Sequence, residues 1–170
     1  GSRIDHGFLT TRRNCVLEAL KPGSHVAAFL RAESPGVRAL YTARPKMKAD
    51  SLIELYISEL RDLYSAETQL LKALPETAEA AGSAELALAL LAHHEQTKGH
   101  VARLDMIFDR LGEKPTGETC KAMQGLVREA GDITSAKGQG EVRDAGIIVA
   151  AQKIEHYEIA GYGSACSFAK

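Results

Sequence analysis

The sequence has no tryptophan, and aromatic residues make up only 5% of its 170 residues. Because strands are enriched in aromatic and β-branched residues, this scarcity argues against a β-rich fold. The three cysteines stand far apart, without metal-ligand spacing, which predicts free thiols in a reduced, cytoplasmic setting. No hydrophobic run approaches the ~20 residues that a membrane-spanning helix needs, so we expect no membrane partner.

Excess charge of one sign is also lacking, since the formal net charge is −1. This balance argues against a nucleic-acid partner. The charge is unevenly spread: residues 1–46 hold 8 Lys and Arg against 3 Asp and Glu, and residues 47–170 hold 13 against 19. Three of the five prolines also lie in residues 1–46. We therefore predict an N-terminal appendage, 1–46, with short helical patches at 15–20 and 25–32, and one helical domain, 47–170.

Hydrophobic residues make up 45% of the chain and recur at helical spacing. The spacing predicts long helices over 51–81, over 83–111 and from about 141 to near the C-terminus, with a short helix over 118–131. A capping box, Ser51 with Glu54, starts the first helix, Pro75 is expected to kink it, and Gly82 and Gly112 end the first two. The predicted fold is all-α.

Two glutamates occupy the centres of predicted apolar stripes, where an ionised carboxylate is costly unless it is paired, hydrogen-bonded or metal-bound. Glu67 has leucines four and seven positions away on both sides. Glu155 has the same offsets to Ile148, Ala151, Ile159 and Tyr162. Each carboxylate therefore needs a charged partner, a hydrogen-bond donor or a metal ion.

The second long helix offers polar partners, because His93, Thr97 and His100 fill a gap in its apolar stripe. An antiparallel hairpin turning near Gly82 brings His100 close to the level of Glu67. Carboxylates and imidazoles that converge in a helical bundle form di-iron or di-manganese sites, and such ligands also suit zinc. The candidate metal ligands are Glu67, His100, Glu155 and Glu158, with His93, Thr97 and Glu95 as weaker candidates.

Structural alternatives stay open for each of these side chains. A histidine on an apolar stripe is commonly a core residue with one hydrogen bond. Either buried glutamate can instead form an ion pair, with Lys72, Lys98 and Lys153 as candidate partners. Glu95 points away from the stripe and is expected on the solvated face, whereas Tyr162 can hydrogen-bond a ligating carboxylate.

Four segments carry a family resemblance: 64–75 (YSAETQLLKALP), 93–100 (HHEQTKGH), 141–145 (EVRDA) and 151–163 (AQKIEHYEIAGYG). The chain from Met47 to about Ser164 resembles the YciF/YciE-like family of bacterial ferritin-like proteins. The resemblance implies a four-helix bundle that forms a homodimer or a higher association, in a family linked to bacterial stress responses.

The resemblance extends to rubrerythrins, and it implies ligand roles by position. Glu67 matches their first-helix ligand, His100 the second-helix histidine, and Glu155 and Glu158 the third-helix pair. Thr97 stands where those relatives have a glutamate, and family members continue into a fourth helix where this sequence stops. The resemblance thus implies a di-metal centre that is incomplete in this chain, and a bundle that is compromised or completed by a partner.

Three functions follow as expectations. The leading one is a ferritin-like stress-response protein that binds iron or manganese. The alternative is a non-catalytic helical dimer or scaffold, in which buried glutamates and histidines form a hydrogen-bond network without metal. A DNA-protecting mini-ferritin is weaker, because the predicted bundle is acidic. Neither a substrate nor catalytic residues are indicated.

Overall fold

The computed structural model describes residues 51–170, except 118, 137 and 139. These residues form four helices and no strand: α4 (Leu52–Ala80), α5 (Ala84–Leu111), α6 (Lys121–Thr134) and α7 (Gly140–Phe168). The all-α, four-helix prediction is therefore confirmed, with three long helices and a short one. The predicted appendage, 1–46, and its helical patches lie outside the described residues.

The helix ends follow from local capping chemistry. Ser51 accepts a hydrogen bond from the backbone N–H of Glu54 at 3.3 Å, and Ser83 caps α5 in the same way. Gly112 ends α5 in the left-handed conformation, with φ 66°, which glycine adopts at little cost. Pro75 lies inside α4, which continues to Ala80. These starts and stops agree with the sequence-based prediction.

The short helix starts later than predicted. Cys120 caps α6, because its Sγ accepts a hydrogen bond from the backbone N–H of Met123 at 3.3 Å. Cysteine is absent from the usual set of N-cap residues, so this start has no capping signal in the sequence. The helix then runs to Thr134, three residues beyond the predicted end.

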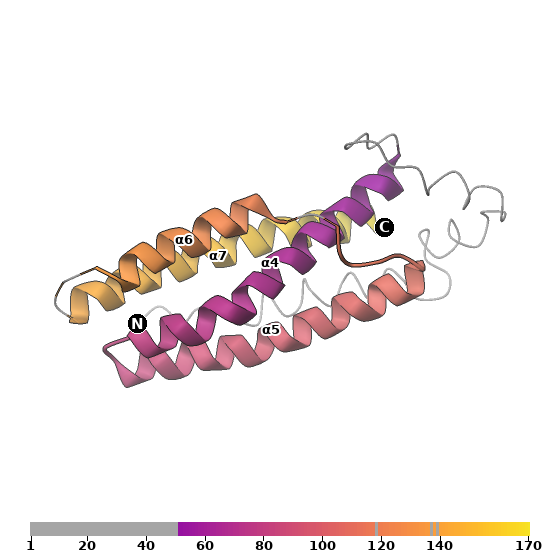
Figure 1. Ribbon diagram of the computed structural model, residues 1–170. Coiled ribbons are helices and arrows are strands. Elements are labelled where there is room, and N and C mark those ends of the chain that lie inside the picture. The colour runs from indigo at the N-terminus through magenta and orange to yellow at the C-terminus, as the bar shows by residue number, and fades with distance from the viewer. Residues whose placement is uncertain (1–50, 118, 137, 139) are drawn as a thin grey trace.

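Helix α4 is the centre of the bundle, since it packs against each of the other three helices. Figure 1 shows α4 beside α5 and α6 beside α7, with the C-terminal end of α7 near the start of α4. Asp144 of α7 fastens the opposite end: its carboxylate accepts hydrogen bonds from the backbone N–H groups of Gly82 and Ser83, at 2.7 and 2.8 Å. The turn between α4 and α5 is thereby tied to α7.

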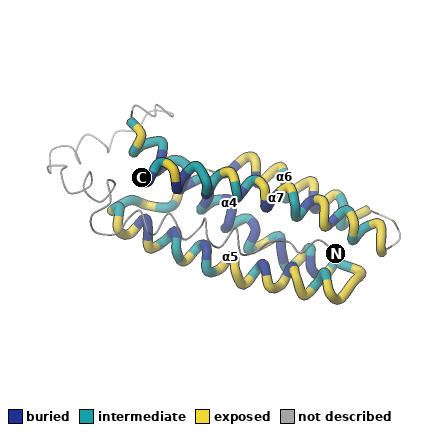
Figure 2. The backbone as a smooth tube through the Cα atoms, turned by 180° about the vertical axis from the view of Figure 1, so that it is seen from behind, coloured by how far each residue is buried: buried dark blue, intermediate teal, exposed yellow. Residues whose placement is uncertain are grey.

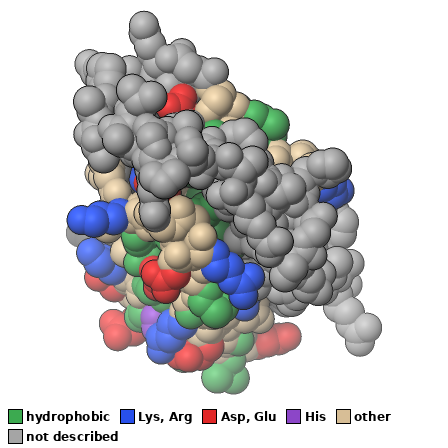
Figure 3. Space-filling model, turned by 90° about the vertical axis from the view of Figure 1, so that its right-hand side faces the viewer, with side chains coloured by type: hydrophobic (Ala, Val, Ile, Leu, Met, Phe, Trp, Pro, Cys, Tyr) green, Lys and Arg blue, Asp and Glu red, His purple; other side chains and the backbone are tan. Residues whose placement is uncertain are grey.

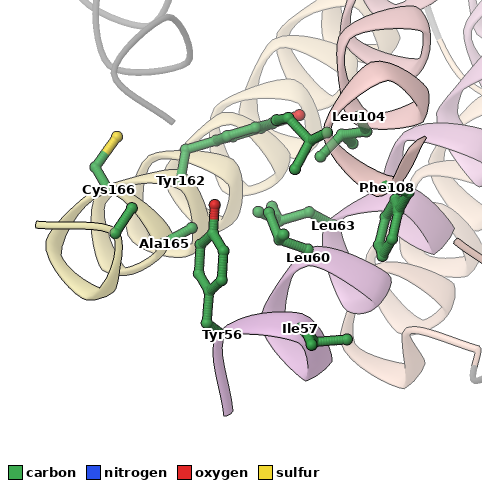
Figure 4. Close-up of a cluster of buried hydrophobic side chains, with 11 residues drawn as sticks. Tyr56, Ile57, Leu60, Leu63, Leu104, Phe108, Tyr162, Ala165 and Cys166 are labelled. Carbon is green, nitrogen blue, oxygen red and sulfur yellow. The ribbon is translucent and has the colours of Figure 1, made fainter. Parts of the chain in front are cut away.

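The hydrophobic core is divided into two clusters along the bundle axis. Figure 2 shows buried positions recurring along each long helix. The first cluster, drawn in Figure 4, joins the start of α4 to the ends of α5 and α7. The second joins the rest of α4 to the start of α5, to α6 and to the first half of α7. Buried members of the first cluster include Tyr56, Leu60, Leu63, Leu104, Phe108 and Tyr162, and those of the second include Leu70, Leu74, Leu90, Met123, Ile147 and Ile154.

The buried face of α7 differs from the predicted stripe. Ile148, expected in the core, is 46% exposed, whereas Ile147, Ala150 and Ile154 are buried. Helix α7 carries apolar residues on two adjoining faces, so hydrophobic spacing alone does not specify which face is covered. Glu155 is nevertheless buried as predicted.

The described surface carries charged side chains of both signs and several exposed apolar side chains. On the face shown in Figure 3, acidic and basic side chains lie next to one another. No helix among those described is both long and apolar enough to cross a membrane.

Candidate metal centre

A band of buried polar side chains separates the two apolar clusters. Each long helix contributes to it at the point where the helix passes from one cluster to the other. Burying so many ionisable and polar groups is costly unless they pair or hydrogen-bond with one another or bind a ligand. The polar band consists of Glu67 from α4, of His93, Thr97 and His100 from α5, and of Glu155 and Glu158 from α7.

Three members of this band have donor atoms close enough to share one ion. His93, Glu155 and Glu158 each offer one ligand atom within 4.8 Å of the other two. The Nε2 atom of His93 lies 3.2 Å from Oε1 of Glu155. All three residues are buried, and Glu158 is 0% exposed. Glu155 and Glu158 stand three positions apart on α7, which puts them on one face of the helix.

The donor set and its spacing fit a divalent transition metal. Metal–ligand bonds of ~2.0–2.2 Å place the donors of one ion about 3–4 Å from each other, within the observed limit. Two carboxylates and an imidazole suit iron, manganese or zinc. Three protein donors also leave coordination positions for a small ligand. The described part of the chain thus contains a buried His/Glu cluster that can hold a metal.

A second pair of the predicted ligands is joined by hydrogen bonds. The Nδ1 atom of His100 lies 3.2 Å from Oε1 and 3.3 Å from Oε2 of Glu67. The Tyr162 hydroxyl donates to Oε1 of the same carboxylate at 2.7 Å, as the sequence suggested for this tyrosine. Glu67 is 0% exposed, so its charge relies on these donors rather than on water.

The structure regroups the candidate ligands. Glu155 and Glu158 lie with His93, which ranked low in the sequence, while Glu67 and His100 are outside that group of three. His93 and His100 are seven positions apart on one helical face, which was the sequence signal that both belong to the band. Thr97 is fully buried, and its hydroxyl has no hydrogen-bond partner among the residues that the structure describes.

Glu95 and the lysines lie elsewhere. The side chain of Glu95 is 68% exposed and pairs with Lys98 at 2.7 Å, which lowers the pKa of this carboxyl. Lys153 pairs with Glu129 on the surface at 2.8 Å. The alternative in which Lys98 or Lys153 neutralises a buried glutamate is therefore wrong for both lysines. Both have an exposed carboxylate nearby on the surface, where ion pairs avoid desolvation.

A second polar cluster, which sequence reasoning missed, links α4, the cap of α6 and α7. The hydroxyl of Tyr157 donates a short hydrogen bond to Asp62, and the Sγ of Cys120 lies 2.9 Å from the same hydroxyl. Because the only hydroxyl proton goes to Asp62, the thiol is the donor in the second contact. Hydrophobic spacing gives no signal for this cluster, because it does not indicate that α6 lies over Asp62.

Comparison with known proteins agrees with this architecture. Residues 51–170 match the family described as "Domain of unknown function (DUF892)". Protein YciF of Escherichia coli (strain K12) is 40% identical over 125 residues, which are 73% of this chain and 75% of that protein. The crystal structure of the E. coli stress protein YciF aligns with a TM-score of 0.68 and 41% identity, covering 72% of this chain and 77% of that one.

A second solved structure, YcfI of Rhodopseudomonas palustris, aligns with a TM-score of 0.71 and 39% identity. It covers 74% of this chain and 80% of that chain. The helical bundle, the family match and the identity to YciF lead to one conclusion. The chain belongs to the YciF family (DUF892).

Proposed function

We propose that this protein binds iron or manganese in its polar band and acts in a bacterial stress response. One observation carries the proposal: His93, Glu155 and Glu158 bring three buried donor atoms within 4.8 Å of one another. The stress role rests on similarity to YciF, which is described as a stress protein. An ion bound there would supply one-electron redox chemistry.

The chain's own side chains would orient the ligands. With Nδ1 of His100 donating to Glu67, the other ring nitrogen keeps its lone pair. The Tyr162 hydroxyl also donates to the Glu67 carboxylate and would help to orient it. This arrangement makes Glu67 and His100 the candidates for a second metal position. Thr97 offers no carboxylate there, so we propose that this position is weaker than the first.

Substitution of the α7 carboxylates tests the proposal. We expect Glu158→Gln and Glu155→Gln each to lower the affinity for Fe(II) and Mn(II) by tenfold or more, because second-shell changes alone typically cost ~10–100-fold. Titration calorimetry under anaerobic conditions, with metal analysis of the purified protein, gives the measurement. Glu95→Gln is the matched control, since Glu95 is exposed and outside the cluster. Equal affinities in all four proteins would refute the proposed site.

The hydrogen bonds around Glu67 favour a second candidate function, a scaffold with a metal-free network. The variant Glu67→Gln separates the two. In a metal-free network the neutral amide keeps a hydrogen-bonding carbonyl, so stability should change little or rise. If Glu67 is a ligand, the same change should reduce the stabilisation that added metal gives. Melting curves with and without Mn(II) report the difference.

A further inference from the structure

A small cavity lies between the four helices, on one side of the polar band. Its volume is about 20 Å³, which is room for at least one particle the size of water. Every helix contributes to its wall. The wall includes Leu70 of α4, His93 of α5, Ala130 of α6, and Ala150 and Ile154 of α7.

The cavity wall is almost wholly aliphatic. His93 and Thr77 are its only residues with polar side chains, and the Thr77 hydroxyl already donates to the backbone carbonyl of Ala73. A buried water needs ~2–4 polar partners, whereas apolar cavities stay dry and take up xenon or other apolar molecules. The wall therefore favours a small apolar occupant over water.

The same cavity adjoins the candidate metal centre. His93 belongs both to the cavity wall and to the group of three close donor atoms. Ile154, also in the wall, precedes Glu155 on α7. A molecule in the cavity would thus lie against a side chain that we assign to the metal.

We propose that this cavity is a binding site for dioxygen, held beside His93. Dioxygen is apolar and only slightly larger than water, so it matches both the volume and the wall. Hydrogen peroxide would need partners for two donors and four lone pairs, which an aliphatic wall does not provide. The use of the bound gas as an oxidant rests on the proposed metal function, but the binding itself does not.

The binding is testable on the metal-free full chain. Dissolved dioxygen is paramagnetic and should broaden the methyl signals of Leu70 and Ile154, and xenon should shift them. Ala150→Val, and independently Ala130→Val, adds methyl groups to the wall and should abolish both effects. Ala78→Val is the matched control, a buried alanine of the second cluster outside the wall. Unchanged broadening in both wall variants, with native melting, would overturn the site.

A second measurement tests the use of the gas. Two ferrous ions can each give one electron to dioxygen, which takes up two protons and leaves as hydrogen peroxide. In iron-loaded protein, we expect the wall variants to slow ferrous oxidation by dioxygen severalfold, with oxidation by added peroxide and ferrous affinity unchanged. Equal slowing with both oxidants would contradict delivery from the cavity. If no iron binds, the proposed function fails while the gas-binding result still decides the site.

Discussion

At the scale of single residues, Cys120 and Tyr157 show how burial sets protonation. Burial raises the pKa of the Cys120 thiol, although the hydrogen bond from the backbone N–H of Met123 partly opposes the shift. Burial also raises the pKa of the Tyr157 hydroxyl, and its hydrogen bond to Asp62 adds to the effect. Both groups are thus held in their protonated form, in which they connect α4, α6 and α7.

The Cys120 shift predicts a pH dependence of stability. An unfolded cysteine loses its proton near pH 8.5, while the folded thiol keeps it to higher pH. The stabilisation is therefore fully present below about pH 8.5 and is lost as the pH rises through the folded pKa, with a slope of at most about 1.4 kcal/mol per pH unit. Urea unfolding between pH 7 and 10 should show a steeper decline for the wild type than for Cys120→Ala. Parallel declines would contradict the assignment.

At this scale, helical spacing predicted which polar side chains are buried. It did not predict how these side chains group. The positions of Glu67, His100, Glu155 and Glu158 followed from helical spacing, because spacing fixes the face on which a side chain lies. The grouping of His93 with the α7 carboxylates depends on the rotation of α7, and the thiol cap at Cys120 depends on tertiary contact. The periodicity of the sequence contains no information on the rotation of α7 or on this tertiary contact.

At the scale of helices, close approach between α4 and α7 depends on Gly161. A Cβ atom at this position would lie 2.8 Å from Cδ2 of Leu63, a side chain that is only 1% exposed in the first cluster. In contrast, a Cβ atom at Gly125 of α6 meets nothing within 4 Å. The two glycines therefore differ in contact, although both lie inside helices.

This contrast predicts opposite effects of one substitution. Gly125→Ala should stabilise the protein by ~0.5–1 kcal/mol, because alanine loses less backbone entropy in a helix. Gly161→Ala gains the same entropic stabilisation but should be destabilising overall, since overpacking a core costs ~1–3 kcal/mol. Chemical denaturation of both variants gives the comparison. Stabilisation by Gly161→Ala would contradict this prediction, because it would mean that α4 and α7 can move apart without loss of packing energy.

At the scale of the whole molecule, metal should act on the folding equilibrium. A ligand that binds only the folded state adds about 2.7 kcal/mol to the free energy of unfolding at a hundred times its Kd. We expect Mn(II) to raise the melting temperature of the wild type and of Glu95→Gln. It should leave Glu158→Gln near its metal-free value. Scanning calorimetry with a chelator control tests this, and an equal rise in all three proteins would indicate binding elsewhere.

Large apolar side chains are exposed on two helices of the bundle. Leu88 and Leu91 of α5, and Val142 and Val149 of α7, are large apolar residues that are 44–68% exposed. We propose that these faces contribute to a homodimer, because exposed apolar side chains are stabilised when a partner covers them. Val149→Lys should lower the average mass in sedimentation equilibrium towards that of one chain. Gln124→Lys, on the exposed side of α6, should not.

The polar band also has a consequence for cooperativity. A bundle with one continuous core opens as a unit, whereas here ionisable groups interrupt the core between its two clusters. The long helices are thus the main connection between two halves that can open at different free energies, as hydrogen exchange would report. An ion held by α5 and α7 would strengthen that connection. Metal loading would then set whether this protein unfolds in one step or in two.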